Sequence, residues 1–282
     1  EIGVRLVGSE MCIRDSNRLS IGVQSFFEED LKLMNRAHTV SEAFSSIELA
    51  LQHFENISLD LIYGIPGMTN ERWEENINKA LALGVPHLSC YALTVEPKTA
   101  LKSFIEKGIV PPVDDEVAAS HHAILVESIE RAGYENYEFS NFSKPGFYSR
   151  NNTAYWDGVA YLGIGPSAHS FDGNQRSWNV RNNTKYIKEI ETGNLPIERE
   201  VLSIEDKYNE YIMTRLRTQK GISIDYVAEA FGIKHVEYLL KQASGSIKSG
   251  YLIRDRDRLL VSKKGKFLSD GIASDLFLVN LD

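Results

Sequence analysis

The sequence predicts an α/β protein, a partial (β/α) barrel followed by a small helical, winged-helix-like domain. Three observations lead to this fold class. Short apolar runs alternate with amphipathic segments in the first half of the chain, which is typical of parallel β/α units. The pattern changes near residue 196 to closely spaced helices and a hairpin. Hydrophobic residues make up 43% of the 282, which is enough to build a substantial core.

Five elements follow one another in the first part of the chain, and the spacing of apolar residues defines each one. Residues 18–26 (RLSIGVQSF) form a short apolar run that is typical of a buried strand. Segments 39–54 and 70–83 carry apolar residues at helical spacing, whereas 57–66 and 87–94 are strand-like. The order strand, helix, strand, helix, strand predicts a parallel sheet with binding residues at the carboxyl ends of its strands.

The middle of the chain is predicted to contain a helix, a strand and a loop region. The helix covers 118–132, and residues 134–143 are predicted to form one further strand. From 141 to 178 the composition shifts to Gly, Asn, Ser and aromatic residues, as expected of a functional loop region over a scaffold.

The last part of the chain is predicted to form three helices and a hairpin. The helices are expected at 205–217, 224–231 and 236–249, and the strands at 252–254 and 259–261. A winged helix can bind DNA, but the many acidic residues on these helices favour a packing or interaction role. The expected domain boundaries are 1–16, 17–195 and 196–282.

Composition excludes several classes of function. With 39 acidic and 31 basic residues, the net charge is −8, and no basic face is available to bind nucleic acid. No apolar run reaches about 18 residues and no signal pattern opens the chain, so a cytoplasmic protein without a transmembrane segment is expected. Cys12 and Cys90 are too few for a disulfide framework, a zinc site or an iron–sulfur cluster.

The first sixteen residues differ from the rest. They show no clean helical or strand period, and EMCIRDS at 10–16 resembles the translation of a sequencing-library adapter. We therefore expect residues 1–16, with Cys12, to be non-native and the true N-terminal part to be missing. The alternative is an ordinary unstructured terminus.

Polar residues interrupt the apolar runs at or near the predicted carboxyl ends of strands. Gln24 lies near the end of the first strand, Asp60 lies within the second, and Arg36 ends a short helix-like run. A carboxylate in an apolar run needs a donor or a charge, so Asp60 either pairs structurally or faces a ligand. Each residue alone has a structural explanation; their shared position favours a ligand site.

Four blocks of this region, in order, resemble a known family. They are RLSIGVQSF at 18–26, MNRAH at 34–38, DLIYGIPG at 60–67 and YALTVEP at 91–97. Together they resemble the second half of the radical S-adenosylmethionine core in the oxygen-independent coproporphyrinogen III oxidase family.

The later blocks are similar to the heme chaperone branch of that family. These are YEFSNFSKPG at 137–146, NNTAYW at 151–156 and YLGIGPSAHS at 161–170. Residues 209–222 (NEYIMTRLRTQKGI) are similar to the family's C-terminal domain, so the resemblance extends over nearly everything from Asn17 onward.

The resemblance implies cofactors and site residues. Gln24, Arg36 and Asp60 match positions that contact S-adenosylmethionine, and an arginine can pair with its carboxylate while Gln and Asp take ribose hydroxyls. The family binds a [4Fe–4S] cluster through a CxxxCxxC motif, which this chain lacks. No metal ligand and no catalytic residue is therefore predicted in this chain.

Heme binding needs aromatic walls, cations near the propionates and, usually, an axial ligand. The candidate heme region contains Tyr155, Trp156, Tyr161, His169 and Trp178, with Arg150 and Arg176 nearby. The chaperone branch usually reads HNxxYW, whereas Asn151 stands at the histidine position here, and His169 is the candidate to replace it. The structural alternatives are that Tyr155 and Trp156 are packing residues and that His169 forms ordinary hydrogen bonds. The adjacent His121 and His122 are predicted to be surface residues.

These observations predict a fragment of a radical S-adenosylmethionine heme chaperone that binds heme and passes it to an unidentified acceptor protein. The alternative is an oxygen-independent coproporphyrinogen III oxidase, so the sequence leaves open whether the intact protein is an enzyme. A third hypothesis is a barrel fragment without a ligand. Because a truncated sheet leaves an edge and apolar surface open, we also expect poor solubility.

Overall fold

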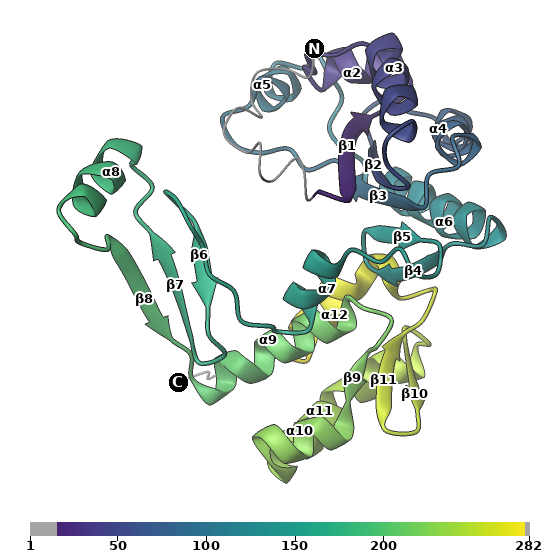
Figure 1. The fold of residues 1–282 in the computed structure, drawn as a ribbon. Helices are drawn as coiled ribbons and strands as arrows, with labels where there is room; N and C mark the ends of the chain where they lie inside the picture. The colour runs from purple at the N-terminus through teal and green to yellow at the C-terminus, as the bar shows by residue number, and fades with distance from the viewer. Residues whose placement is uncertain (1–15, 280–282) are drawn as a thin grey trace. The chain divides into compact units, whose positions relative to one another are not determined.

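A computed structural model describes residues 16–279 (Figure 1). The chain divides into two compact units between Tyr148 and Ser149, and each is described by itself. Residues 1–15, which carry most of the segment expected to be non-native, lie outside the described residues. The domain boundaries expected from the sequence remain predictions.

The first unit is built on a five-stranded sheet in the order β1-β2-β3-β5-β4. Strands β1 (Arg18–Gln24), β2 (Asn56–Tyr63) and β3 (His87–Ala92) are parallel. This confirms the α/β fold class with its parallel sheet. Strands β4 (Glu135–Glu138) and β5 (Asn141–Ser143) are antiparallel to each other, and β5 is antiparallel to β3.

The single strand predicted at 134–143 is therefore wrong, because the chain turns back at its centre. The Asn136 side chain donates to the carbonyl oxygen of Glu138 at 2.6 Å and to that of Asn141 at 3.3 Å. These bonds satisfy backbone acceptors at the turn, which favours a tight reversal over a continuous strand.

Five helices connect and flank these strands among the described residues of the first unit. They are α2 (Glu28–Leu33), α3 (Val40–Leu51), α4 (Asn70–Ala82), α5 (Ala100–Glu106) and α6 (Asp115–Arg131). Helix α3 begins at a capping box in which Thr39 accepts from the Glu42 amide and Glu42 accepts from Thr39. The sequence did not indicate α5, a short helix without a buried residue.

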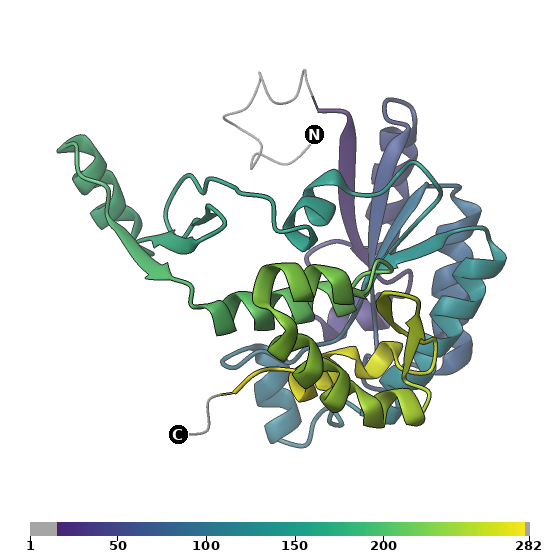
Figure 2. The same cartoon turned by 90° about the horizontal axis from the view of Figure 1, so that it is seen from below.

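Helices α4 and α6 pack against the apolar face of the sheet (Figures 1 and 2). The alternate β2 residues Ile57, Leu59, Leu61 and Tyr63 are all at most 1% exposed and point to this face. The Tyr63 ring lies 5.5 Å from that of Trp73 on α4. The predicted β/α units therefore bury the apolar side of β2 at the centre of the parallel strands.

The expectation that His121 and His122 are surface residues is wrong, since they are only 0% and 5% exposed. Both lie on the side of α6 that packs inward. The backbone amide of Gly64 donates to His121 Nδ1 at 3.1 Å, and His122 stacks on Phe139 with 5.8 Å between ring centres. The spacing of apolar residues predicts the helix itself, but it does not predict which face of α6 is covered, because that depends on packing against other elements.

The second unit opens with helix α7 (Arg150–Trp156) and a three-stranded antiparallel sheet. The sheet contains β6 (His169–Phe171), β7 (Gln175–Asn179) and β8 (Ile197–Val201), with α8 (Asn183–Glu191) between the last two. The region predicted to be a loop therefore contains short regular elements.

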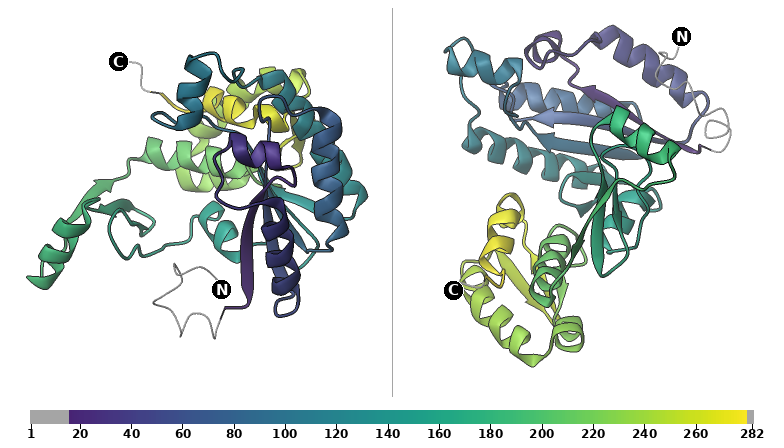
Figure 3. Two further views of the ribbon diagram at one scale, coloured as in Figure 1. Left: turned by 90° about the horizontal axis from the view of Figure 1, so that it is seen from above. Right: turned by 90° about the vertical axis from the view of Figure 1, so that its left-hand side faces the viewer.

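The remainder of the second unit contains the predicted three helices and hairpin, with strand β9, a 3-10 turn and helix α12 in addition, gathered together in Figure 3 (right panel, light green to yellow). Its elements are α9 (Ile204–Leu216), β9 (Ile222–Ser223), α10 (Ile224–Phe231), α11 (Ile233–Lys248), β10 (Leu252–Asp255), β11 (Arg258–Val261), a 3-10 turn (Lys266–Leu268) and α12 (Ser269–Asp275). Tyr208, Ile212 and Leu239 lie in one buried core here. None of the helices formed by residues 16–279 has the length and apolar character needed to cross a membrane.

Candidate functional site

The face of the parallel sheet opposite α4 and α6 is polar. Because strand side chains alternate, Ser58 and Asp60 point away from the apolar core residues on either side of them. The strand register places His87 beside Ser58 and Ser89 beside Asp60. We call this surface the polar face; it consists of Ser20, Gln24, Ser58, Asp60, His87, Ser89 and Asn141.

A chain of hydrogen bonds joins the buried groups of the polar face. Ser58 Oγ lies 2.7 Å from His87 Nδ1, and His87 Nε2 lies 2.8 Å from the Tyr137 hydroxyl. Ser89 Oγ donates to Asn141 Oδ1 at 2.7 Å. Burial, assisted by the charge of Arg18, lowers the pKa of His87 to about 3. The imidazole is therefore neutral at physiological pH, and its two nitrogens link Ser58 to Tyr137 by hydrogen bonds.

Gln24 and Asp60, two of the three residues predicted to bind S-adenosylmethionine, lie together on this face. Gly22 is the register partner of Asp60, and Gln24 Nε2 lies 2.6 Å from where a Cβ on Gly22 would stand. Gln24 has φ +68°, which turns its side chain back over the glycine. A side chain at Gly22 would displace the amide, so the glycine leaves room for Gln24 beside Asp60.

The Asp60 carboxylate lies inside β2 rather than at its end. Ser20 Oγ donates to Asp60 Oδ1 at 3.1 Å. Burial raises the pKa of Asp60, while hydrogen bonds from Ser20 and Ser89 and the charge of Arg18 partly oppose that effect. The carboxylate thus has donors, yet it is only half-buried, and a carboxylate has lone pairs enough to accept a further bond from a ligand.

The third predicted residue, Arg36, is exposed and lines a separate cavity of about 360 Å³. Other walls of this cavity come from Leu93 and Glu96, which follow the carboxyl end of β3, and from Thr99 at the start of α5. Gln24 and Asp60 do not line it. Arg36 therefore lies near a strand end, as predicted, but in a different hollow from the other two.

The second unit contains a larger cavity of about 470 Å³ with aromatic walls. We call it the aromatic cavity. It is formed by α7, the following loop, β6 and β7 on one side and by α9 and α10 on the other. Its aromatic residues are Tyr155, Trp156, Tyr161, Phe171, Tyr211, Tyr226 and Phe231.

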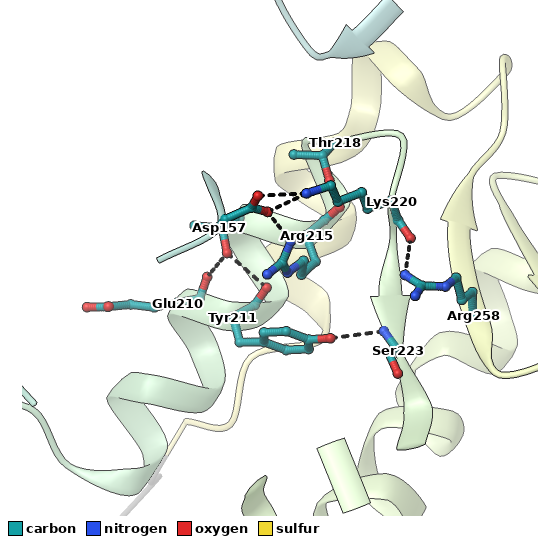
Figure 4. A network of polar contacts seen from close by, with 9 residues as sticks. Asp157, Glu210, Tyr211, Arg215, Thr218, Lys220, Ser223 and Arg258 are labelled. Carbon is teal, nitrogen blue, oxygen red and sulfur yellow. Dashed lines mark hydrogen bonds and ion pairs between the residues drawn. The ribbon is translucent and has the colours of Figure 1, made fainter. Parts of the chain in front are cut away.

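Charged side chains line part of the aromatic cavity. Figure 4 shows the polar network around one of them, Asp157. Asp157 forms ion pairs of 2.7 Å with both Arg215 and Lys220. Burial acts to raise the pKa of Asp157, but the bonds and charges of Lys220 and Arg215 outweigh it and hold that pKa below its usual range. Glu210 pairs with Arg176 at 2.7 Å, and burial raises the pKa of Glu210.

Several predicted heme residues meet in this cavity. Tyr155, Trp156, Tyr161 and Arg176 line it. His169 and Trp178 do not; they face each other across β6 and β7 with ring centres 6.0 Å apart. His169 is two residues before the lining residue Phe171 in β6, and Trp178 is two residues after the lining residue Arg176 in β7, so all four lie on the same face of the sheet.

Arg150 and Asn151 lie at the start of α7 and are exposed. The sequence did not indicate Lys207, Tyr211, Tyr226 or Phe231 as site residues. All four belong to the predicted C-terminal domain, where helical spacing alone cannot distinguish a ligand wall from packing. Among the described residues that line the aromatic cavity there is no His, Cys or Met.

The described residues offer no cluster ligands. Within 16–279 there is no group of three or more His, Cys, Asp or Glu arranged to hold a metal ion. Cys90 is buried in β3, and burial raises its thiol pKa, which disfavours the thiolate that an iron site requires. This part of the chain therefore does not fit a [4Fe–4S] cluster.

Two family models match the chain. The radical SAM superfamily matches residues 12–90, and the HemN C-terminal domain matches residues 202–268. The chain is therefore a radical SAM protein with a HemN-type C-terminal domain. Its fold is similar to that of coproporphyrinogen III oxidase (HemN) from Escherichia coli, with a TM-score of 0.78 at 21% identity over 95% of this chain and 65% of that one. At that identity the similarity concerns the fold alone.

Curated relatives define the family more closely. The heme chaperone HemW of Bacillus subtilis is 34% identical over 91% of this chain, and that of Lactococcus lactis is 31% identical over 94%. The match spans 68% and 70% of those two proteins. The chain belongs to the heme chaperone HemW family, which confirms the chaperone branch over the oxidase branch.

Proposed function

We propose that this chain is the heme-holding part of a heme chaperone, which binds heme in the aromatic cavity and passes it to an acceptor protein. The observation that carries the proposal is the aromatic cavity itself. It combines seven aromatic side chains with the cations Arg176, Lys207 and Arg215. A planar apolar ring with two carboxylates needs this combination of walls and charges.

The cavity also suits a protein that must release its heme. Strong axial ligands such as His, Cys and Met are absent from its lining, and its tyrosines offer weaker ligation. His169 remains the candidate axial ligand from the neighbouring sheet face, with Trp178 beside it. Whether a tyrosine or His169 bound the iron, aromatic contacts rather than a fixed pair of iron ligands would supply most of the energy of heme binding.

Radical SAM proteins as a class use S-adenosylmethionine and a [4Fe–4S] cluster. For S-adenosylmethionine the polar face fits in part: Gln24 and Asp60 offer an amide and a carboxylate to the ribose hydroxyls. Arg36, the cation expected for the methionyl carboxylate, lines the separate cavity instead. The cofactor would supply the radical chemistry of the class. The cluster would need ligands other than those of residues 16–279, as described above.

The heme proposal is tested by titrating the chain with hemin and following the Soret band. We expect a saturable shift at one heme per chain. Trp156→Ala should weaken binding about tenfold because it removes one aromatic wall. Phe104→Ala is the matched control, since Phe104 is an exposed aromatic residue on α5 of the first unit. Absence of a saturable shift, or equal effects of both substitutions, would contradict the proposal.

Transfer is tested separately by mixing the heme-loaded chain with an apo-hemoprotein and following the acceptor's absorbance. The acceptor should acquire heme, whereas retention by the chain would argue against a chaperone. The identity of the natural acceptor and the cytoplasmic location expected from composition remain predictions.

The polar face is tested by equilibrium binding of S-adenosylmethionine. Asp60→Ala should weaken binding about tenfold, because a charge-assisted bond to a ribose hydroxyl is lost. Glu55→Ala, which removes an exposed carboxylate just before β2, should have no effect. Equal affinities of the two variants would remove Asp60 from the site.

A further inference from the structure

The charges around the aromatic cavity are not balanced. Asp157 pairs with Arg215, and Glu210 pairs with Arg176. Lys207, on α9, also lines the cavity, and its ammonium group donates to Asn174 Oδ1 at 2.9 Å. Within residues 16–279, no carboxylate lies within ion-pair distance of Lys207. The cavity therefore presents one cation that forms no ion pair.

The second cation at this edge is Arg176. Glu210 lies three positions after Lys207 on α9, so the two side chains share a side of the helix, and Glu210 holds Arg176 at 2.7 Å. Lys207 reaches Asn174 in the turn between β6 and β7, and Arg176 follows in β7. Two cations thus lie close together at the junction of α9 with the β6–β7 turn.

An ammonium without an ion-pair partner, beside aromatic walls, favours a ligand that is both aromatic and anionic. Exchanging the neutral Asn174 oxygen for a carboxylate would strengthen the hydrogen bond of Lys207, because charge-assisted bonds are the stronger kind. Arg176 already has a carboxylate partner in Glu210, so a new anion gains more at Lys207.

We propose that Lys207 binds a propionate of the heme and makes the cavity selective for porphyrins with free carboxylates. The inference rests on the proposed heme site and extends it, because it assigns ligand recognition to the C-terminal domain. That domain is then part of the binding site rather than only a packing module.

The test compares hemin with hemin dimethyl ester, whose propionates carry no charge. Both are titrated into the full chain as wild type, Lys207→Ala, Lys207→Arg and Lys185→Ala. Lys185 is an exposed lysine on α8 that does not line the cavity, so its variant is the matched control. We expect Lys207→Ala to weaken hemin binding about tenfold and to leave ester binding unchanged within about twofold. Lys207→Arg should retain most of the hemin affinity.

The outcomes separate the two proposals. If wild-type chain binds hemin and Lys207→Ala binds it equally well, the Lys207 assignment fails while the heme site stands. If Lys207→Ala weakens hemin and ester equally, Lys207 acts through the structure and the assignment also fails. If wild-type chain shows no saturable hemin binding, the proposed function fails as well. Circular dichroism of each variant checks that the substitutions leave the fold intact.

Discussion

The polar face and the aromatic cavity, the two proposed ligand surfaces, are of opposite construction. The polar face is formed by neighbouring strands, and its buried groups are locked by hydrogen bonds such as those of His87. The aromatic cavity is formed by elements far apart in sequence, from Tyr155 on α7 to Phe231 on α10. Its tyrosines Tyr155 and Tyr226 are 49% and 47% exposed.

This difference indicates how each surface couples to stability. A buried network is costly to interrupt, because every member that loses its partner remains desolvated. Truncating an exposed side chain of the cavity wall should change the free energy of unfolding little, since such side chains already contact water. Substitutions of the buried, hydrogen-bonded members of the polar face should therefore lower the free energy of unfolding, whereas those in the aromatic cavity should change binding first.

The largest effect is expected for His87→Ala. It removes the ring that joins Ser58 to Tyr137 and leaves a void, so the free energy of unfolding should fall by about 2–4 kcal/mol. Tyr226→Ala in the aromatic cavity should cost less than about 1 kcal/mol. Urea denaturation followed by circular dichroism measures both values. Equal losses would remove the distinction between the two surfaces.

The pH dependence of stability should also reveal the polar face. The pKa of His87 is about 3 in the folded chain and has its ordinary value of 6.5 when unfolded. As the pH falls below 6.5 the unfolded state takes up a proton that the folded state excludes. The His87 contribution is therefore complete above pH 6.5 and declines below it, by roughly 2 kcal/mol at pH 5. The free energy of unfolding of His87→Gln, measured against pH, should lack this decline; parallel curves would contradict the neutral buried histidine.

Each unit contains a helix that begins at a capping box, so the two caps should contribute similarly to the free energy of unfolding. Thr39 and Ser203 each form a capping box, one at α3 and one at α9. Thr39→Ala and Ser203→Ala should each lower the free energy of unfolding by about 1 kcal/mol. Ser244→Ala, an exposed position inside α11, should change it by less than about 0.5 kcal/mol. Thermal denaturation compares the three, and a cap substitution as silent as Ser244→Ala would refute its capping role.

The smallest effect is expected at the edge of the aromatic cavity. Asp157 and Arg215 are 29% and 20% exposed and 2.7 Å apart. A double-mutant cycle with Asp157→Asn and Arg215→Met should give a coupling energy of roughly 0.5–1 kcal/mol, which decreases in concentrated salt. Additive effects would show that Lys220 alone compensates Asp157.

Much of the first unit could be predicted from local pattern. Apolar alternation and helical spacing identified three parallel strands and three of the helices between and after them. The same pattern marked Asp60 as a charged residue within an otherwise apolar run. Two predictions failed for different reasons. The burial of His121 depends on contacts with residues distant in sequence, such as Gly64, which no local period records. The reversal after Asn136 depends on side-chain bonds to nearby backbone carbonyls, which an alternation of apolar and polar residues does not reveal.

In the second unit, the sequence indicated Tyr155 and Trp156 as candidate heme contacts, but not the residues that complete their cavity. Lys207 and Tyr211 lie on a helix whose spacing is equally consistent with a packed bundle. Their convergence with α7 depends on side-chain contacts such as the ion pairs of Asp157.

The sequence by itself determined the α/β class, the family and the positions of Gln24, Arg36 and Asp60, because these follow from local periodicity and short ordered blocks of residues. Only the tertiary structure decided which of those residues share a surface, that His87 is buried and neutral, and that the C-terminal domain supplies cations to the aromatic cavity. The physical reason is that burial and charge compensation are properties of groups brought together by folding, and their partners lie far apart along the chain.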